Sequence, residues 1–251
     1  MSVTIQSLPD IPVIMPGDDL AAHIINAAGG AGLALQNSDV LVIASKIVSR
    51  SEGRFASLHD VTPSPQAAEL AATTGKDARL VEYVLRESES VSRAGPNVLV
   101  TRHRLGFVSA NAGIDQSNVG QGGDVVLLLP VDPDASAERL RAALKARTGV
   151  DAGIVISDTH GRPFRVGNVG VAIGVAGLPA VIDLRGTTDL FGRVMQVSTL
   201  GYADLVASAA HLVCGEGSEG RPVTLVRGLE FPAQDGRASD LIRTAVHDLY
   251  R

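Results

Sequence analysis

The chain has 251 residues, 45 % of them hydrophobic and 3 % aromatic, and its 22 Lys and Arg against 27 Asp and Glu give a formal net charge of −5. A chain this apolar and this weakly charged is expected to fold, which excludes an intrinsically disordered protein. Its acidity argues against nucleic acid as a partner, because neutralising phosphates requires a basic face. The longest apolar stretch, 169–184, is broken by glycines and a proline. It falls short of the ~20 residues that a membrane helix needs, so no membrane partner is expected.

The glycine and cysteine content of the chain leads to further expectations about its structure. The 27 glycines exceed the usual share of ~7 % and predict several close backbone approaches. The single cysteine, Cys214, cannot form an intrachain disulfide and is expected to be a small buried hydrophobic residue. The N-terminus lacks the basic segment and apolar run of a signal peptide, so a cytoplasmic protein is expected.

The first half of the chain is predicted to alternate between strands and helices. The expected elements are a strand at 3–8, a helix at 19–28, a strand at 39–45, and helices at 65–74 and 78–88. Their caps are assigned to Asp18, Ser64 and Asp77, because these side chains accept hydrogen bonds from free helical N–H groups. Pro65 suits the first helical position, and Gly75 ends that helix.

The second half is predicted to continue the alternation. The expected elements are strands at 98–102 and 105–109, a polar loop at 110–123, a strand at 125–129, a helix to 148, a strand at 152–157, a helix at 201–214, a strand at 223–226 and a helix at 239–249. Asp134 or Ser136 is expected to cap the helix that Gly149 ends. The hairpin-like pair at 98–109 implies antiparallel pairing beside any parallel strands. The predicted fold is therefore α+β, with mixed β-sheets and flanking helices in a single domain over 1–251; a weak seam at 130–133 is the candidate boundary between two subdomains.

The glycine-rich segment at 215–220 is ambiguous. Its sequence, GEGSEG, fits G-x-G-x-x-G, but it follows a predicted helix and precedes a strand, the reverse of the dinucleotide fingerprint. The chain contains no G-x-x-x-x-G-K-[ST] P-loop. The segment is either a helix-terminating loop or a loop packed against phosphates or a metal ion, with Glu216 as an acidic ligand.

Two further polar segments carry candidate ligands. Asp158 and Thr159 directly follow a predicted strand, and Arg162 and Arg165 stand in the short glycine-containing loop predicted after them. Arginine forks and bare backbone amides suit an anion. Asp115 lies in the other segment, the polar loop at 111–118, and has oxygen ligands around it that suit a hard cation.

Each of these acidic residues is also explained by a turn or a cap. If Asp115, Asp158 and Glu216 converge, however, they would hold one or two Mg²⁺ or Mn²⁺ ions against phosphate oxygens. The segment at 45–50, with Ser45, Lys46 and Arg50, is either a contact for phosphate or carboxylate or an exposed basic rim.

Taken together, these segments resemble the coenzyme F420:L-glutamate ligase family, the gamma-glutamyl ligases that build the tail of the deazaflavin coenzyme. The resemblance covers nearly the whole chain. It is carried by 11–20 (IPVIMPGDDL), 39–54 (DVLVIASKIVSRSEGR), 111–119 (NAGIDQSNV), 129–141 (LPVDPDASAERLR), 157–177 (SDTHGRPFRVGNVGVAIGVAG) and 215–228 (GEGSEGRPVTLVRG). The third and fifth are specific in combination.

The resemblance implies an intertwined homodimer that uses GTP without a P-loop. It also implies two divalent cations per site, Mg²⁺ or Mn²⁺, with K⁺ as a further candidate. The γ-phosphoryl group of GTP would pass to a carboxylate of the precursor F420-0, and the amine of L-glutamate would then attack the acyl phosphate. Such chemistry needs positioning and charge neutralisation more than a protein nucleophile.

The resemblance also implies roles for individual residues. The metal ligands would be Asp115, Asp158, Thr159 and Glu216. The nucleotide would be lined by Ile11, Pro12, Val13, Ile14, Ser45, Lys46, Arg50, Asn118, Gly215, Gly217, Ser218 and Gly220. Asp158, Arg162 and Arg165 are the catalytic candidates, the two arginines for substrate carboxylates or the transferring phosphate. Two positions depart from the family: Arg50 replaces its usual Lys, with a different fork geometry, and Phe191 stands where the family often has Tyr.

Two alternatives stay open at this stage. A relative on the same scaffold would glutamylate another acid, such as a folate-type substrate. A non-catalytic GTP-binding regulator would bind nucleotide without turnover, and it would suit an incomplete set of carboxylates. All three carboxylates are present here, which favours catalysis.

Overall fold

A computed structural model of the chain describes residues 2–117, 119 and 123–248. The strands are β1 (Thr4–Ser7), β2 (Val40–Ala44), β3 (Phe55–Ser57), β4 (Ser88–Gly95), β5 (Val98–His103), β6 (Val108–Ala110), β7 (Val125–Leu127), β8 (Gly153–Arg162), β9 (Arg165–Ala176), β10 (Val181–Asp183), β11 (Thr199–Gly201) and β12 (Val223–Arg227). The α-helices are α1 (Leu20–Gly30), α2 (Ser45–Ser51), α3 (Pro65–Thr74), α4 (Ala78–Arg86), α5 (Pro133–Thr148) and α6 (Tyr202–Cys214). None of the helices in these described ranges has the length and hydropathy to cross a bilayer.

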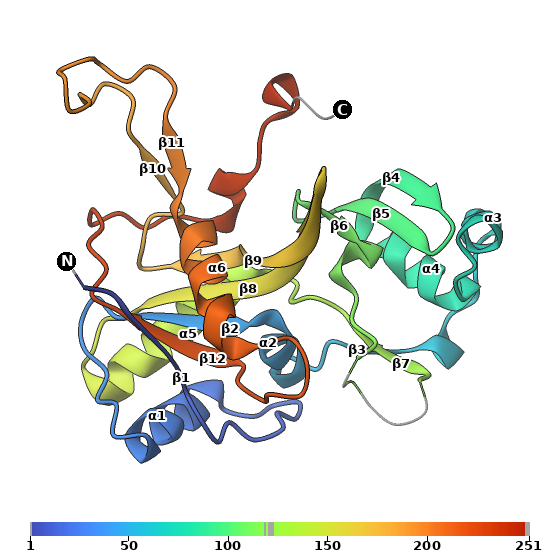
Figure 1. Cartoon of the computed structure of the whole chain (residues 1–251). Coiled ribbons are helices and arrows are strands. Elements are labelled where there is room, and N and C mark those ends of the chain that lie inside the picture. The colour runs from blue at the N-terminus through green and yellow to red at the C-terminus, as the bar shows by residue number, and fades with distance from the viewer. Residues whose placement is uncertain (1, 118, 120–122, 249–251) are drawn as a thin grey trace.

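A five-stranded mixed sheet forms the centre of the fold, in the order β1-β12-β2-β8-β9 (Figure 1). The neighbours β2 and β8 run parallel, and the other pairs are antiparallel. The parallel pair fits its sequence, because β2 is a continuous apolar run and strands buried on both faces read that way. The mixed α+β class predicted from the sequence is confirmed.

Helices cover both faces of this sheet, and alternation along the strands divides the core. Leu41 and Ile43 of β2 pack with α1 and α5 on one face. Val40 and Val42, one position out of phase, pack with α6 on the other. Successive strand side chains point to opposite faces, so one short strand contributes to two cores. α6 approaches β9 closely, since a Cβ on Gly170 would overlap the backbone and side chains of that helix.

A second group of elements has a core of its own. It contains α3, α4, the antiparallel sheet β4-β5-β6 and the small sheet β3-β7, and it lies to one side of the central sheet (Figure 1). Its buried residues include Leu58, Leu80, Val84 and Leu99. The predicted α3 and α4 are confirmed with their caps: Ser64 and Asp77 accept helical N–H bonds, and Gly75 takes the left-handed C-cap conformation.

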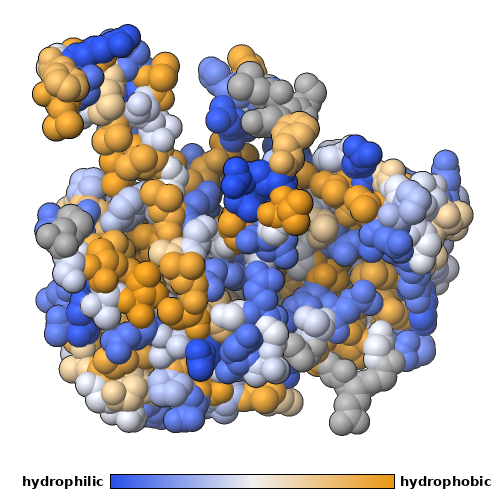
Figure 2. Space-filling model, in the orientation of Figure 1, coloured by the Kyte–Doolittle hydropathy of each residue, from blue (hydrophilic) through white to orange (hydrophobic). Residues whose placement is uncertain are grey.

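One hairpin stands away from the body. β10 and β11 are the base of a projection formed by residues 181–201, which we call the arm (orange in Figure 1). Its outer part is ordered by an isolated bridge between Thr188 and Val194. Three of its large apolar side chains are almost fully exposed, at 98 % for Leu190, 94 % for Phe191 and 84 % for Val197. Figure 2 shows this hydrophobic colouring on the projecting arm.

Several local predictions were wrong, each for a physical reason. The N-cap of α1 is Asp19 rather than Asp18, and that of α5 is Asp132 rather than Asp134 or Ser136. The strand predicted to end at Asp158 continues to Arg162, because β9 pairs with it along its length. The C-terminal helix is replaced by two short 3-10 turns, Ala238–Leu241 and Ala245–His247.

Candidate functional site

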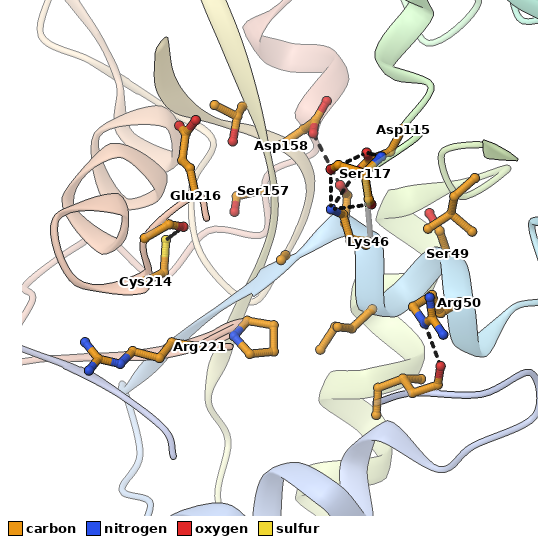
Figure 3. A pocket seen from close by; sticks show the side chains of 18 of the residues that line it. Lys46, Ser49, Arg50, Asp115, Ser117, Ser157, Asp158, Cys214, Glu216 and Arg221 are labelled. Atoms are coloured by element: carbon orange, nitrogen blue, oxygen red, sulfur yellow. Dashed lines mark hydrogen bonds and ion pairs between the residues drawn. The ribbon is translucent and has the colours of Figure 1, made fainter. Parts of the chain in front are cut away.

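A cavity of about 520 Å³ opens at the carboxyl end of β2, where its parallel pairing with β8 stops. Crevices at this edge of a parallel pair are common ligand sites, because the loops that follow the strands gather there. The walls come from the segment 11–14, α2, the loop leading to β7, the middle of β8, and the end of α6 with the loop after it. Residues of β2, β12 and the end of β7 with the segment after it complete the lining. Figure 3 shows these walls and the polar side chains on them.

Most residues implicated by the sequence line this cavity. They are Ile11, Pro12, Val13, Ile14, Ser45, Lys46, Arg50, Asp115, Asp158, Thr159, Gly215, Glu216, Gly217 and Gly220. Ser218, Arg162 and Arg165 do not line it, and Asn118 lies outside the described residues. The fold therefore brings together segments that are more than one hundred positions apart in the sequence.

Lys46 and Asp115 form the closest charged contact in this set. The Lys46 Nζ atom lies 2.6 Å from Oδ2 of Asp115, and it donates to the carbonyl and hydroxyl oxygens of Ser117 at 3.2 Å each. Oδ1 of Asp115 accepts from the N–H and the hydroxyl of Ser117, both at 2.7 Å. Asp115 is held in place by backbone hydrogen bonds in both directions with Leu127 of β7. The ammonium group of Lys46 and the oxygens of Asp115 and Ser117 thus form a compact cluster (Figure 3).

The turn before Asp115 is strained. Asn111, Ala112 and Gly113 have φ angles of 50°, 52° and 66°, a left-handed conformation that costs energy for residues other than glycine. Glycine is required at the third position, since a Cβ there would lie 2.6 Å from Cδ1 of Leu129 and 3.2 Å from Oδ2 of Asp158. The turn thus packs directly against the second carboxylate of the cavity.

Asp158 lies in β8 between two polar side chains. Its Oδ1 atom is 3.4 Å from the Ser45 hydroxyl, which donates to it, and its Oδ2 atom is 3.0 Å from Nε2 of His160. Asp158 and His160 are two positions apart in a strand, so their side chains share a face. Thr159, between them, also lines the cavity.

Arg50 connects α2 to the rim segment 11–14. Its Nε atom donates to the carbonyl oxygen of Ile14 at 2.7 Å, and its guanidinium lies 5.2 Å from the centre of the Phe55 ring. Another guanidinium nitrogen donates to the carbonyl oxygen of Val119 at 3.4 Å. This Arg50 therefore joins three walls of the cavity, using a fork that a lysine could not offer.

The loop after α6 forms the remaining wall. Gly215 has a φ of 74°, and Oε1 of Glu216 lies 3.8 Å from Nδ1 of His211. Cys214 lines the cavity and is half-buried rather than fully buried as predicted. Burial raises the pKa of its thiol, and the charges of Glu216 and Glu219 raise it further, so the thiol stays protonated. Since the segment leads from a helix to a strand, the rejection of the dinucleotide fingerprint holds.

The two arginines predicted to be catalytic lie at the turn between β8 and β9. Arg162 ends one strand and Arg165 begins the next, and the apolar residues Phe164 and Val166 around them are 96 % and 100 % exposed. The segment read from the sequence as a loop is thus the tip of a long hairpin. Within the described chain, neither arginine belongs to the cavity walls.

Two buried hydroxyl groups also line the cavity, and only the second of them was missed by the sequence analysis. Ser49 and Thr224 line the cavity with side chains that are each 1 % exposed. Neither hydroxyl has a hydrogen-bond partner among the described residues. Buried hydroxyls of this kind suit a polar ligand, since an unsatisfied group is costly. Ser49 belongs to the segment 45–50 that the sequence marks as a candidate contact for phosphate or carboxylate. Thr224 stands in the apolar run of β12, where no signal separates it from a core position.

The donor chemistry of the cavity suits a hard cation, although the protein ligands are few. No group of three or more His, Cys, Asp or Glu side chains able to hold a metal ion occurs in residues 2–117, 119 and 123–248. Asp115 and Asp158 offer carboxylate oxygens and Thr159 a hydroxyl, while Glu216 lies on the opposite side of Asp158 from Asp115 (Figure 3). Mg²⁺ is commonly held by one or two carboxylates with phosphate oxygens and water completing its shell, so this set fits a cation that arrives with a phosphate.

Comparison with known proteins gives a consistent result over the full length. Residues 10–228 match the family described as F420-0:gamma-glutamyl ligase. The chain is similar to the coenzyme F420:L-glutamate ligase of Methanopyrus kandleri, with 46 % identity over 100 % of this chain and 98 % of the relative. It is also similar to the enzymes of the same name from Methanothermobacter thermautotrophicus, 43 % identical over 100 % of both chains, and Halobacterium salinarum, 44 % identical over 96 % and 92 %.

Proposed function

Because the chain belongs to the F420-0:gamma-glutamyl ligase family, we propose that it is a GTP-dependent ligase that adds L-glutamate through gamma linkages to the deazaflavin precursor F420-0. The observation that carries this proposal is the full-length similarity to proteins named coenzyme F420:L-glutamate ligase. The cavity adds independent support, because it gathers two carboxylates, a lysine and glycine-rich backbone at one edge of a parallel strand pair.

The proposed reaction proceeds through an acyl phosphate. A carboxylate is a poor acyl donor, because its leaving group would be an oxide. Transfer of the γ-phosphoryl group from GTP to a carboxylate oxygen of F420-0 gives GDP and an acyl phosphate. The amine of L-glutamate then attacks the acyl carbon, the C–O bond to phosphate breaks, and the amide and inorganic phosphate are released with loss of a proton from the amine. Charge neutralisation and alignment dominate such transfers, which agrees with a cavity that lacks a Ser-His-Asp arrangement among its described lining residues.

In this proposal the metal ligands are Asp115, Asp158, Thr159 and Glu216. Two Mg²⁺ or Mn²⁺ ions, with K⁺ as a further candidate, would supply charge neutralisation for the phosphate oxygens. Cations held by the carboxylates of two walls would fix the phosphates between them. Lys46 would add a positive charge beside Asp115.

The nucleotide is assigned to the walls made of backbone and apolar side chains. The segment 11–14 would form an apolar shelf, held against α2 by Arg50, and Gly215, Gly217 and Gly220 would allow the backbone to approach closely. Ser49 and Thr224 supply hydroxyls in the interior of the same cavity. Arg162 and Arg165 remain candidates for binding substrate carboxylates. They would do so from the tip of the β8–β9 hairpin and not from a wall of the cavity.

We also propose that the chain forms an intertwined homodimer. The arm is ordered by backbone pairing yet exposes Leu190, Phe191 and Val197 almost completely. Contiguous exposed apolar side chains mark interaction surfaces, and an arm that projects from the body can reach around a second copy. Phe164 and Val166 at the tip of the β8–β9 hairpin add to the apolar surface in need of cover.

A direct assay tests the proposed activity. Purified protein is incubated with F420-0, GTP, L-glutamate and Mn²⁺, and the products are analysed by mass spectrometry and nucleotide chromatography. We expect a product heavier by one or more glutamyl units, with multiple-turnover release of GDP only when both acceptor and glutamate are present. Absence of both a mass shift and GDP contradicts the proposal.

Parallel incubations separate the two alternatives. If the chain acts on another acid, a folate-type acceptor gives the glutamylated product and F420-0 does not. If it is a GTP-binding regulator, GTP binds in an equilibrium assay while glutamate and acceptor leave the rate of GDP formation unchanged.

A further inference from the structure

His160 is a buried side chain that touches the cavity only through Asp158. It is 8 % exposed, it does not line the cavity, and its Nε2 atom lies 3.0 Å from Oδ2 of Asp158. An ionised carboxylate can only accept hydrogen bonds, so Nε2 must carry the proton and donate. The contact fixes one oxygen of Asp158 from the side away from the cavity.

The imidazole ring of His160 is itself held in place by an aromatic stack. The ring of Phe107 lies 4.9 Å from it at an angle of 47°, and the ring of His103 stacks on Phe107 at 5.0 Å and 11°. His103 is completely buried, and its Nδ1 accepts from the N–H of Leu105 at 2.9 Å. Its proton therefore sits on Nε2, which faces Glu87 at 3.7 Å.

This stack connects the candidate site with the second group of elements. His103 ends β5, and Phe107 lies just before β6, whereas His160 belongs to β8 of the central sheet. The position of the Asp158 carboxylate is thus set by three rings that bridge two parts of the fold. A residue needed only to fill space between them would not need to place a hydrogen-bond donor on a cavity carboxylate.

We propose that His160 is a positioning residue for Asp158, holding Oδ2 so that Oδ1 is presented to a divalent cation in the cavity. This inference rests on the proposed function, which makes Asp158 a metal ligand. Outer partners that orient a metal-binding side chain commonly change metal affinity by ~10- to 100-fold when removed. His160 would then act on cation binding and not on the substrates directly.

The test compares three variants in Mn²⁺ titrations followed by electron paramagnetic resonance, with GDP present. His160→Phe keeps an aromatic ring but removes the donor, and His160→Gln keeps an N–H donor on a flexible chain. His59→Gln is the matched control, since His59 is exposed and pairs with Asp124 outside the cavity. We expect His160→Phe to weaken Mn²⁺ binding by ~10-fold or more, His160→Gln to recover most of it, and the control to match the wild-type protein.

The outcomes are decided without turnover. Mn²⁺ binding by His160→Phe at wild-type strength overturns the inference. Equal weakening of Mn²⁺ binding in His160→Phe and His160→Gln, with equal losses of thermal stability, also overturns it, because that pattern indicates an effect of packing alone. Failure of the wild-type protein to bind Mn²⁺ overturns it as well. Failure of the proposed function is distinguishable, since wild-type protein that makes no glutamylated product can still show the expected order of Mn²⁺ affinities.

Discussion

Lys46 forms an ion pair with Asp115 inside the cavity, with Nζ 2.6 Å from Oδ2. The other carboxylate oxygen is engaged by Ser117 through two hydrogen bonds of 2.7 Å. A cation that binds Asp115 must therefore compete with the ammonium group. A phosphate in the cavity would offer that ammonium another partner, so nucleotide and metal ion are expected to bind with positive coupling.

Replacing Lys46 by Met should reveal this competition. We expect Mn²⁺ affinity without nucleotide to rise about two- to fivefold, since a partly exposed ion pair is worth up to ~1 kcal/mol, and GTP affinity to fall. Isothermal titration calorimetry measures both. The matched control is Lys145→Met, which removes an ion pair with Asp151 outside the cavity. Weaker Mn²⁺ binding by the Lys46 variant without nucleotide would show that the lysine does not compete.

Asp158→Asn is expected to abolish glutamate-dependent GDP formation while leaving the fold intact. The amide keeps the shape of the side chain, and its single oxygen can still accept from His160 while its NH2 group donates to the Ser45 hydroxyl. It lacks, however, the charge that a cation needs. Because losing an outer partner costs up to ~100-fold, losing a direct ligand should cost on the order of 100-fold or more. Steady-state assays measure the rate, and circular dichroism checks folding. Full activity in the variant would remove Asp158 from the proposed metal set.

Local signals in the sequence located most of the elements but few of the contacts. Short-range patterns predicted β2 and α3 correctly. The first is the apolar run of β2, and the second is Ser64–Pro65 at the start of α3 with Gly75 at its end. The cap of α5 was not predicted correctly, because Asp134 instead accepts from the N–H groups of Val175 and Ala238 at 2.8 and 3.0 Å. This role of Asp134 depends on residues that lie far away in the sequence and come near it only in the folded chain.

The same distinction applies to the site. The sequence marked Asp115, Asp158 and Glu216 as candidate ligands but left their convergence open. The structure brings all three to one cavity, through long-range folding that spacing alone does not show. The extension of β8 beyond Asp158, and the contact of His160 with that residue, follow from pairing with β9. Sequence position alone carries no signal for such pairing, so Arg162 was read as part of a loop.

Charged substitutions in the arm should break the proposed dimer without unfolding the chain. Leu190→Asp combined with Phe191→Asp places two charges on side chains that are 98 % and 94 % exposed in the single chain. Since neither side chain supports the core, the variant should fold, but desolvating two carboxylates would oppose association. Size-exclusion chromatography with light scattering should report a dimer for the wild type and a monomer for the variant. Thr187→Asp, on the same arm, serves as the comparison for added charge alone, and a wild-type monomer contradicts the proposal.

Glu87 joins the aromatic stack to a buried charge network. Its side chain is 9 % exposed and lies 2.8 Å from Arg104, 3.3 Å from Arg54 and 3.7 Å from His103. Burial alone would raise the pKa of this carboxyl group. The contact with His103 and the charges of Arg104 and Arg54 outweigh burial, and the pKa lies below its usual value of 4.5.

Glu87→Gln should therefore destabilise the fold in a pH-dependent way. A carboxyl group whose pKa is lower in the folded state than in the unfolded state stabilises the protein when the pH is above the unfolded-state pKa, about 4.5. This stabilisation is lost as the pH falls through the folded-state pKa. Removing the charge of Glu87 from this largely buried network should lower the free energy of unfolding by about 2–3 kcal/mol at pH 7. The difference in unfolding free energy between variant and wild type should shrink progressively below pH 4.5. Urea denaturation at several pH values measures it. Glu89→Gln, which removes an exposed partner of Arg102, should change the free energy of unfolding by less than ~0.5 kcal/mol. A difference for Glu87→Gln that stays constant across this pH range would mean that lost packing, and not lost charge, is responsible.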